Sequence, residues 1–195
     1  TFFYIQIENK NSKIFYVKNN SIKYEQKFNF GTEIIVNDIC KITSLEYQSV
    51  KDLISENHNI LKICDKEILE QKYFNNQQHR KIKKNLISKI AEARIEELSE
   101  IFYLKNINLK KILGEIDKIF LEINDQQHLS CFNHAYEKNF AYNNKYEVKF
   151  VKKPGIEQVV NKADNIVQYG WKKEAIPVYK EKTSYITKIF RSIFS

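Results

Sequence analysis

Arg94 stands where an apolar side chain is expected, and a guanidinium in such a position can bind a carboxylate. It lies near the middle of the apolar half of a predicted helix, with Lys83 on the same line and Glu97 beside it. In one interpretation its stem lies along apolar surface and its head reaches a carboxylate of the same protein. In the other, the guanidinium lies at the floor of a groove and receives an acidic segment of a partner.

Three other residues carry side chains that bind metals, His128, Cys131 and His134. Their spacing rotates them around a helix instead of aligning them, and no fourth ligand is obvious nearby, so no metal site is predicted. The local sequence suggests neither a Ser-His-Asp nor a Cys-His arrangement, and His58 and His79 lie in polar linkers. These residues therefore do not indicate catalysis.

The helix that carries Arg94 is predicted over residues 80–104, a stretch without Gly or Pro. At about 100° per residue, its apolar residues fall within roughly one half of the circumference and polar residues take the other half. This pattern is typical of an amphipathic helix packed on a core. The apolar half comprises Leu86, Ile87, Ile90, Ala91, Ile95, Leu98, Ile101 and Phe102.

The composition indicates a folded protein, with 13% aromatic and 43% apolar residues in a chain of 195. The net charge of +8 does not predict nucleic-acid binding, because the lysines are spread along the chain instead of clustering in one patch. Three cysteines without CxxC spacing favour a reducing cytoplasm. The sequence contains neither a signal peptide nor an apolar run of ~20 residues that could span a bilayer. Because the chain begins at Thr1, directly on a strand pattern, we interpret it as a fragment.

The elements expected along the chain form an α/β arrangement. Residues 2–7, 13–17 and 21–30 predict three strands of an antiparallel meander. Thr32 is the expected N-cap of a helix through Ile35, Ile39 and Ile42. The remaining expectations are a helix over 45–56, a β-like piece over 59–68, a polar linker over 71–79, the long helix, a helical piece over 109–114, a buried strand over 118–123, a helix over 129–140, a strand over 146–151 and a helix over 158–171.

The order of these elements predicts that the first and last parts of the chain share one sheet, with a side domain inserted between them. Residues 1–57 and 111–176 are expected to be the two parts of the main subdomain. Residues 58–110 are expected to form the insertion that carries the long helix, and residues 177–195 a linker followed by an amphipathic helix.

Two segments resemble the family of the actin-like bacterial cell-division protein FtsA. In the first, a glycine precedes an Ile-x-x-Asp-Ile helix and a second amphipathic helix; in the second, an arginine within the long helix precedes a Glu-Glu-Leu pattern. The resemblance implies the second domain of an actin-like fold, a ribonuclease-H-like subdomain with a small inserted α/β subdomain and a C-terminal amphipathic helix. The matching residues are Gly31, Ile34, Asp38, Ile39, Arg94, Glu96, Glu97 and Leu98.

The resemblance also implies ATP and magnesium, but two nucleotide-binding loops differ here. The family carries an Asp-Ile-Gly-Gly-Gly-Thr-Thr type of loop in the first hairpin, whose backbone amides hold phosphate. In this chain Gln6 replaces the carboxylate and Glu8 replaces a glycine. The later Thr-Gly-Gly-Gly stretch reads Glu122, Ile123, Asn124 and Asp125. Side chains at the glycine positions fill space that a nucleotide needs, so ATP binding is expected to be weak or lost.

The C-terminal stretch 184–195 follows a polar linker and predicts a helix with one apolar face. Such a helix either docks on its own domain or lies in the membrane interface. Members of the FtsA family end in a membrane-targeting helix, which favours the second interpretation. The residues expected to contact an anionic membrane are Tyr185, Ile186, Lys188, Ile189, Phe190, Arg191, Ile193 and Phe194.

The resemblance further implies a partner, the acidic and apolar C-terminal peptide of the tubulin-like division protein FtsZ, which the small second subdomain receives. Arg94 stands at a contact position, and Lys83, Lys84 and Glu97 are its predicted neighbours. The predicted function is a membrane-associated adaptor that tethers the FtsZ ring to the cytoplasmic face of the bacterial inner membrane at the division site. Self-association into actin-like filaments is a further implication. An actin-like ATPase lacking its first domain, a pilus-assembly scaffold and a nucleic-acid binder are the alternatives.

Overall fold

The computed structural model describes residues 1–19, 21–56, 67–74, 78, 80–143, 145–152 and 160, and only the backbone of residues 126–130. The chain divides into two compact units, residues 1–153 and 154–195, and the described residues belong almost entirely to the first. No helix among these residues is long and apolar enough to cross a bilayer.

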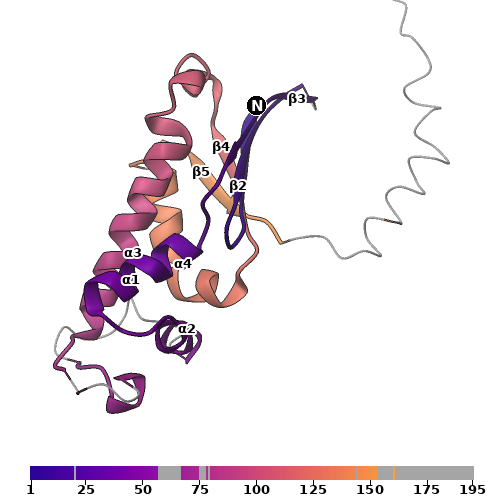
Figure 1. The fold of residues 1–195 in the computed structure, drawn as a ribbon. Helices are drawn as coiled ribbons and strands as arrows, with labels where there is room; N and C mark the ends of the chain where they lie inside the picture. The colour runs from indigo at the N-terminus through magenta and orange to yellow at the C-terminus, as the bar shows by residue number, and fades with distance from the viewer. Residues whose placement is uncertain are drawn as a thin grey trace, which may run out of the picture. The chain divides into compact units, whose positions relative to one another are not determined.

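A five-stranded mixed sheet forms one layer of the first unit (Figure 1). Its strands lie in the order β3-β2-β1-β4-β5. Strand β2 runs opposite to the other four: it pairs antiparallel with β1 and β3, whereas β1 pairs in parallel with β4, and β4 with β5. The strands are β1 (Phe2–Ile7), β2 (Ser12–Lys18), β3 (Ser21–Phe28), β4 (Lys118–Ile123) and β5 (Glu147–Phe150). The β-rich runs in the sequence predicted all five, and the first three form the expected meander.

Helices cover one face of this sheet, with α3 and α4 side by side (Figure 1). The α-helices are α1 (Glu33–Thr43), α2 (Tyr47–Glu56), α3 (Lys84–Ser99) and α4 (Gln126–Ala141). Short helical turns are η2 (Gln71–Phe74), the π-turn η3 (Glu100–Leu104), η4 (Ile107–Leu109) and η5 (Leu113–Glu115). Because α3 contacts both α1 and α4, it belongs to the same hydrophobic core as the sheet.

Aromatic rings fill the space between the sheet and the helices. Tyr103 lies at the centre, with its ring 6.3 Å from that of Phe3 on β1 and 6.0 Å from that of Phe140 on α4. Its hydroxyl donates a hydrogen bond of 2.6 Å to the carbonyl oxygen of Phe140. Burial raises the pKa of this phenol far above its ordinary value, so the side chain stays neutral.

The apolar half predicted for the long helix is buried over most of its length. Ile87, Ala91 and Ile95 are fully buried, whereas Leu86 is 40% exposed and Ile101 37% exposed. The helix itself is shorter than predicted, because α3 begins at Lys84 and ends at Ser99 before the π-turn. Sequence periodicity did not detect the π-turn, which changes the buried face: Ile101 of the predicted apolar half is exposed, whereas Tyr103 is fully buried.

One expectation about local structure was wrong. Residues 71–79 were expected to be a polar linker, but Tyr73 and Phe74 in η2 are 4% and 1% exposed and belong to the core. Thr32 occupies the N-cap position of α1, as expected, although its side chain makes no capping hydrogen bond. The expected β-like piece at 59–68 lies largely outside the described residues, as do the helix at 158–171 and the terminal helix. The subdomain boundaries at 57, 110 and 176 stay predictions.

Candidate functional site

Arg94 joins α3 to α1. Its Nε donates a hydrogen bond to Oδ2 of Asp38 on α1, and its Nη1 lies 2.5 Å from Oε2 of Glu97, one turn along α3. The side chain of Arg94 is 25% exposed and that of Asp38 is 15% exposed. This geometry matches the first interpretation of Arg94, an arginine whose head reaches carboxylates of its own chain.

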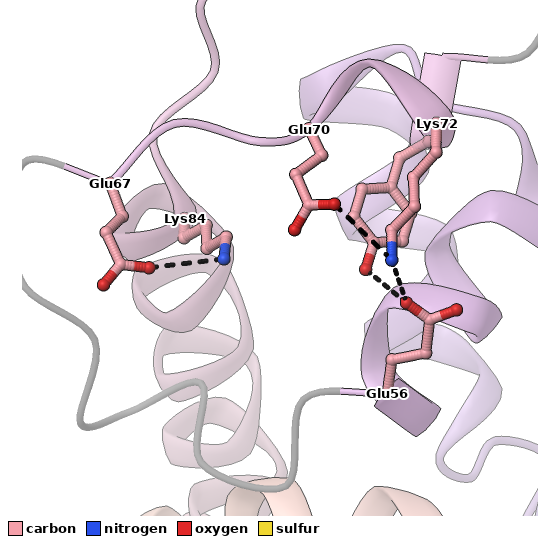
Figure 2. A network of polar contacts seen from close by, with 6 residues as sticks. Glu56, Glu67, Glu70, Lys72 and Lys84 are labelled. Atoms are coloured by element: carbon pink, nitrogen blue, oxygen red, sulfur yellow. Dashed lines mark hydrogen bonds and ion pairs between the residues drawn. The ribbon is translucent and has the colours of Figure 1, made fainter.

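The segment before α3 is held by a short antiparallel contact with residues 67–69. Ile68 pairs with Lys83, and the backbone amide of Leu69 donates to the carbonyl oxygen of Ile82 at 2.8 Å. Figure 2 shows Lys84 reaching the carboxylate of Glu67, with Nζ and Oε2 3.3 Å apart. Lys84 is therefore engaged within the protein, whereas the side chain of Lys83 is exposed and has no polar partner in the described part of the chain.

A second set of charges in Figure 2 ties η2 to the end of α2. Lys72 Nζ lies 2.6 Å from Oε2 of Glu56, and the hydroxyl of Tyr73 donates to the same oxygen at 2.6 Å. Hydrogen bonds from Lys72 and Tyr73 lower the pKa of Glu56. These contacts hold η2 against the end of α2.

A groove lies at the N-terminal end of α3. It encloses about 570 Å³, within the range that holds a small ligand or a few side chains of a peptide. Its apolar surface comes from Ile82, which is half-buried, and from Leu86. The complete lining is Lys81, Ile82, Lys83, Asn85, Leu86 and Lys89. Of these residues the sequence analysis assigned only Lys83 to a site, although the run of lysines before the helix was a signal for the others.

The charges along α3 oppose the usual preference of a helix. Lysines line the groove at its N-terminal end, no acidic residue lies in its first turn and no basic residue in its last. Glu92, Glu96 and Glu97 follow in its second half. Because the N-terminal end of a helix already carries a partial positive charge, this arrangement concentrates positive potential at the groove.

The hairpin between β1 and β2 occupies the place where the actin-like resemblance implies a phosphate loop. It is tight, and the amide of Glu8 donates to the carbonyl oxygen of Asn11 at 2.9 Å. The carbonyl oxygens of Glu8 and Asn9 accept hydrogen bonds from the amides of Thr32 and Glu33 at 3.0 and 2.9 Å. The hairpin, and not the Thr32 side chain, thus caps α1, so these N-terminal amides are not available to an anion.

Gly31 shows how closely the hairpin and α1 approach. A β-carbon at this position would lie 1.9 Å from the carbonyl oxygen of Glu8 and 2.7 Å from that of Asn9. The Ser12 hydroxyl adds a hydrogen bond of 2.7 Å to the carbonyl oxygen of Phe30. The backbone segments therefore leave no room for a side chain at position 31, although a pocket of about 300 Å³ lies beside them. It is lined by Asn9, Lys10, Asn29, Phe30, Gly31, Glu33, Ile34 and Asn37.

The second nucleotide loop of the family corresponds to the end of β4, where Glu122 is 2% exposed. Its carboxylate accepts hydrogen bonds from the hydroxyl of Tyr4 and, at 3.3 Å, from Nε2 of Gln6. Partial burial and the bond to Glu122 raise the pKa of Tyr4 to about 12. After the strand, the amide of Asn124 donates to the carbonyl oxygen of Ile7 at 3.0 Å. Gln6 and Glu122 are thus occupied with each other, and the residues of both loops do not fit ATP.

Of the three potential metal ligands, the two whose side chains are described lie on different sides of α4. Cys131 is buried and donates from Sγ to the carbonyl oxygen of Ile54 at 2.7 Å, while His134 is exposed on another side of α4. The side chain of His128 lies outside the described residues, as do the predicted membrane contacts from Tyr185 to Phe194. Within the described ranges no group of three His, Cys, Asp or Glu side chains could hold a metal ion.

No protein-family model and no curated protein matches this sequence. Solved structures do resemble it. MreB 5 of Spiroplasma citri, bound to AMPPNP, aligns with a TM-score of 0.51 at 16% identity, over 97% of this chain and 54% of its own. The ethanolamine utilization protein EutJ of Carboxydothermus hydrogenoformans aligns with a TM-score of 0.50 at 9% identity, over 76% of this chain and 43% of its own. A type IV pilus biogenesis complex, PilM–PilN, aligns with a TM-score of 0.46 at 7% identity, over 85% of this chain and 42% of the matched chain.

EutJ and MreB 5 are proteins of the actin-like ATPase fold, so the predicted actin-like fold of this chain is confirmed. The chain spans about half the length of these two structures. At identities of 9% and 16% the similarity concerns the fold alone, and it does not single out the FtsA family.

Proposed function

We propose that this chain acts as an adaptor of the FtsA type, which tethers FtsZ polymers to the cytoplasmic face of the bacterial membrane at the division site. The observation that carries the proposal is the contact between the β1–β2 hairpin and the N-terminus of α1. This hairpin occupies the place of the phosphate loop, and its residues do not fit ATP. This observation argues against the ATPase alternative and favours a function that depends on binding to a partner and a membrane. The actin-like fold itself is compatible with the adaptor and with the pilus scaffold alike.

The membrane contact belongs to the C-terminal stretch 184–195. Six aromatic or isoleucine side chains recur on one face of a helical wheel, and Lys188 and Arg191 lie on the other. A helix of this kind inserts its apolar face at the level of the headgroups and attracts anionic lipids. This tail distinguishes the adaptor from the pilus scaffold.

Two weak contacts suit this function. A single short amphipathic helix binds a bilayer only marginally, which makes the attachment reversible. An FtsZ polymer presents many C-terminal peptides, so a modest affinity for each peptide adds up through effective concentration. Stable tethering therefore requires both the tail and the peptide site on the same molecule.

Cosedimentation with vesicles that contain anionic phosphatidylglycerol tests this function. We expect the full chain to sediment with the vesicles and to recruit FtsZ polymers to them. A chain that ends at Thr183 should stay in the supernatant with an unchanged circular dichroism melting curve. The full chain with Ile189→Glu and Phe190→Glu is the matched control for loss of the apolar face. Equal sedimentation of all three proteins would refute membrane attachment, and vesicle binding without recruitment of FtsZ would refute the tether.

A further inference from the structure

We infer that the adaptor receives its peptide in the groove at the N-terminal end of α3, and that Arg94 positions α3 without contacting the peptide. The occupant is a short acidic segment with an apolar side chain at its centre. This inference rests on the proposed function, but it places the contact away from Arg94, where the family resemblance would put it.

The guanidinium of Arg94 is already engaged. Its Nε and Nη1 donate to the carboxylates of Asp38 and Glu97, which lie on two different helices. A peptide carboxylate that took over these donors would leave Asp38, only 15% exposed, without its cation. Removing one partner of a partly buried ion pair is unfavourable. The free energy gained by a peptide carboxylate at Arg94 would therefore be offset by the loss of the pair with Asp38.

The groove has the opposite character. Lys81, Lys83 and Lys89 are exposed, and in the described part of the chain no carboxylate pairs with any of them. An acidic segment can therefore bind these ammonium groups without breaking an ion pair that the structure shows. By contrast, Lys84 next to them is held by Glu67 at 3.3 Å.

The apolar surface of the groove explains why the occupant is more than an anion. Leu86 is 40% exposed on the otherwise buried side of α3, and Ile82 contributes a half-buried side chain beside it. An apolar side chain inserted between them removes surface from water, while flanking carboxylates reach the lysines. The volume of about 570 Å³ accommodates a few residues, not a folded domain.

The distribution of charge on α3 selects an acidic partner. Lysines at the N-terminal end add to the partial positive charge of the helix, and the glutamates lie toward the other end. A basic or neutral peptide gains nothing from this field, whereas an acidic one is steered to the groove. Because the lysines are exposed, the attraction weakens as salt is added.

Fluorescence anisotropy with two labelled probes tests the inference on the full chain. One probe is the C-terminal peptide of FtsZ, and the other is a synthetic peptide of equal length in which glutamates flank a central leucine and phenylalanine. The groove variant is Lys83→Glu with Lys89→Glu. The matched control is Lys110→Glu with Lys111→Glu, which changes the net charge equally at two exposed lysines outside the groove.

We expect the groove variant to weaken binding by about tenfold or more and the control by about twofold or less. Arg94→Gln should lower the melting temperature yet leave the affinity within about threefold. The exchanged pair Asp38→Arg with Arg94→Asp should recover only part of the lost melting temperature, because the new carboxylate lies beside Glu97. Peptide binding should persist in this variant, although no arginine remains at position 94. Circular dichroism establishes that each variant is folded.

The outcomes separate this inference from the proposed function. If both probes bind and only Arg94→Gln abolishes binding, the groove assignment is wrong and the adaptor stands. If only the synthetic peptide binds, and the groove variant loses it, the groove is a site for acidic peptides and FtsZ is not its partner. If neither probe binds the folded wild-type chain, both proposals fall.

Discussion

Arg94 on α3 and Asp38 on α1 form an ion pair between residues 56 positions apart in the sequence. Both residues also belong to the two segments that resemble the FtsA family. Their contact connects these segments physically, because the pair holds α3 against α1 and so fixes the helix whose N-terminal end forms the groove. A residue that stands out in the sequence as a binding candidate can thus serve the site by positioning its helix.

Removing either partner of this pair should destabilise the protein. We expect Asp38→Ala and Arg94→Ala each to lower the free energy of unfolding by about 1–2 kcal/mol, less than for a fully buried pair because both groups retain some contact with water. Urea unfolding measures the change. Glu100→Ala is the control, since its pair with Lys105, whose side chain is 71% exposed, is worth about 0.5 kcal/mol or less. Equal losses in all three variants would contradict the positioning role.

Substitution of Gly31 should disturb the contact between the hairpin and α1. A β-carbon there would lie 1.9 Å from a backbone oxygen, so the two segments must separate. We expect Gly31→Ala to cost about 2 kcal/mol or more in the free energy of unfolding. Gly114→Ala is a matched control, because no atom lies within 4 Å of its added methyl group. A Gly31→Ala protein as stable as the control would show that the contact does not form.

The hydrogen bond between Tyr4 and Glu122 predicts a pH dependence of stability. The pKa of Tyr4 is raised from 10.0 to about 12 in the folded protein, so the neutral phenol is favoured by folding. Its contribution is complete below about pH 10 and is lost as the pH rises toward 12. Free energies of unfolding measured across this range should fall more steeply for the wild type than for Tyr4→Phe. Parallel curves would mean that the pKa of Tyr4 is not raised.

ATP should leave the stability of the chain unchanged. A ligand present at 100 times its dissociation constant adds about 2.7 kcal/mol to the free energy of unfolding and raises the melting temperature by several degrees. At about 1 mM ATP with magnesium, a dissociation constant of about 10 μM or lower would produce such a shift. We expect none. A saturable shift would refute the misfit of the hairpin and restore the ATPase alternative.

Local patterns in the sequence determined most of the secondary structure. The alternating run Phe2–Ile7 and the apolar half of α3 were predictable, because each pattern repeats within a few residues and depends only on which face is buried. The replacements at Gln6 and Glu8 could also be recognised from the sequence. Gln6 lacks the charge of the family's carboxylate, and the side chain of Glu8 restricts the backbone where the family has a glycine.

Tertiary structure alone decided which of these residues meet. The sequence contains no sign that Asp38 is the partner of Arg94, that the hairpin carbonyls cap α1, or that Tyr73 and Phe74 are buried, since each of these facts depends on segments far apart in the chain. The same reason explains the groove. From the sequence, a row of lysines before a helix indicates only solvated surface. The structure adds that Leu86 is exposed among these lysines and that no carboxylate within the described residues pairs with Lys81, Lys83 or Lys89.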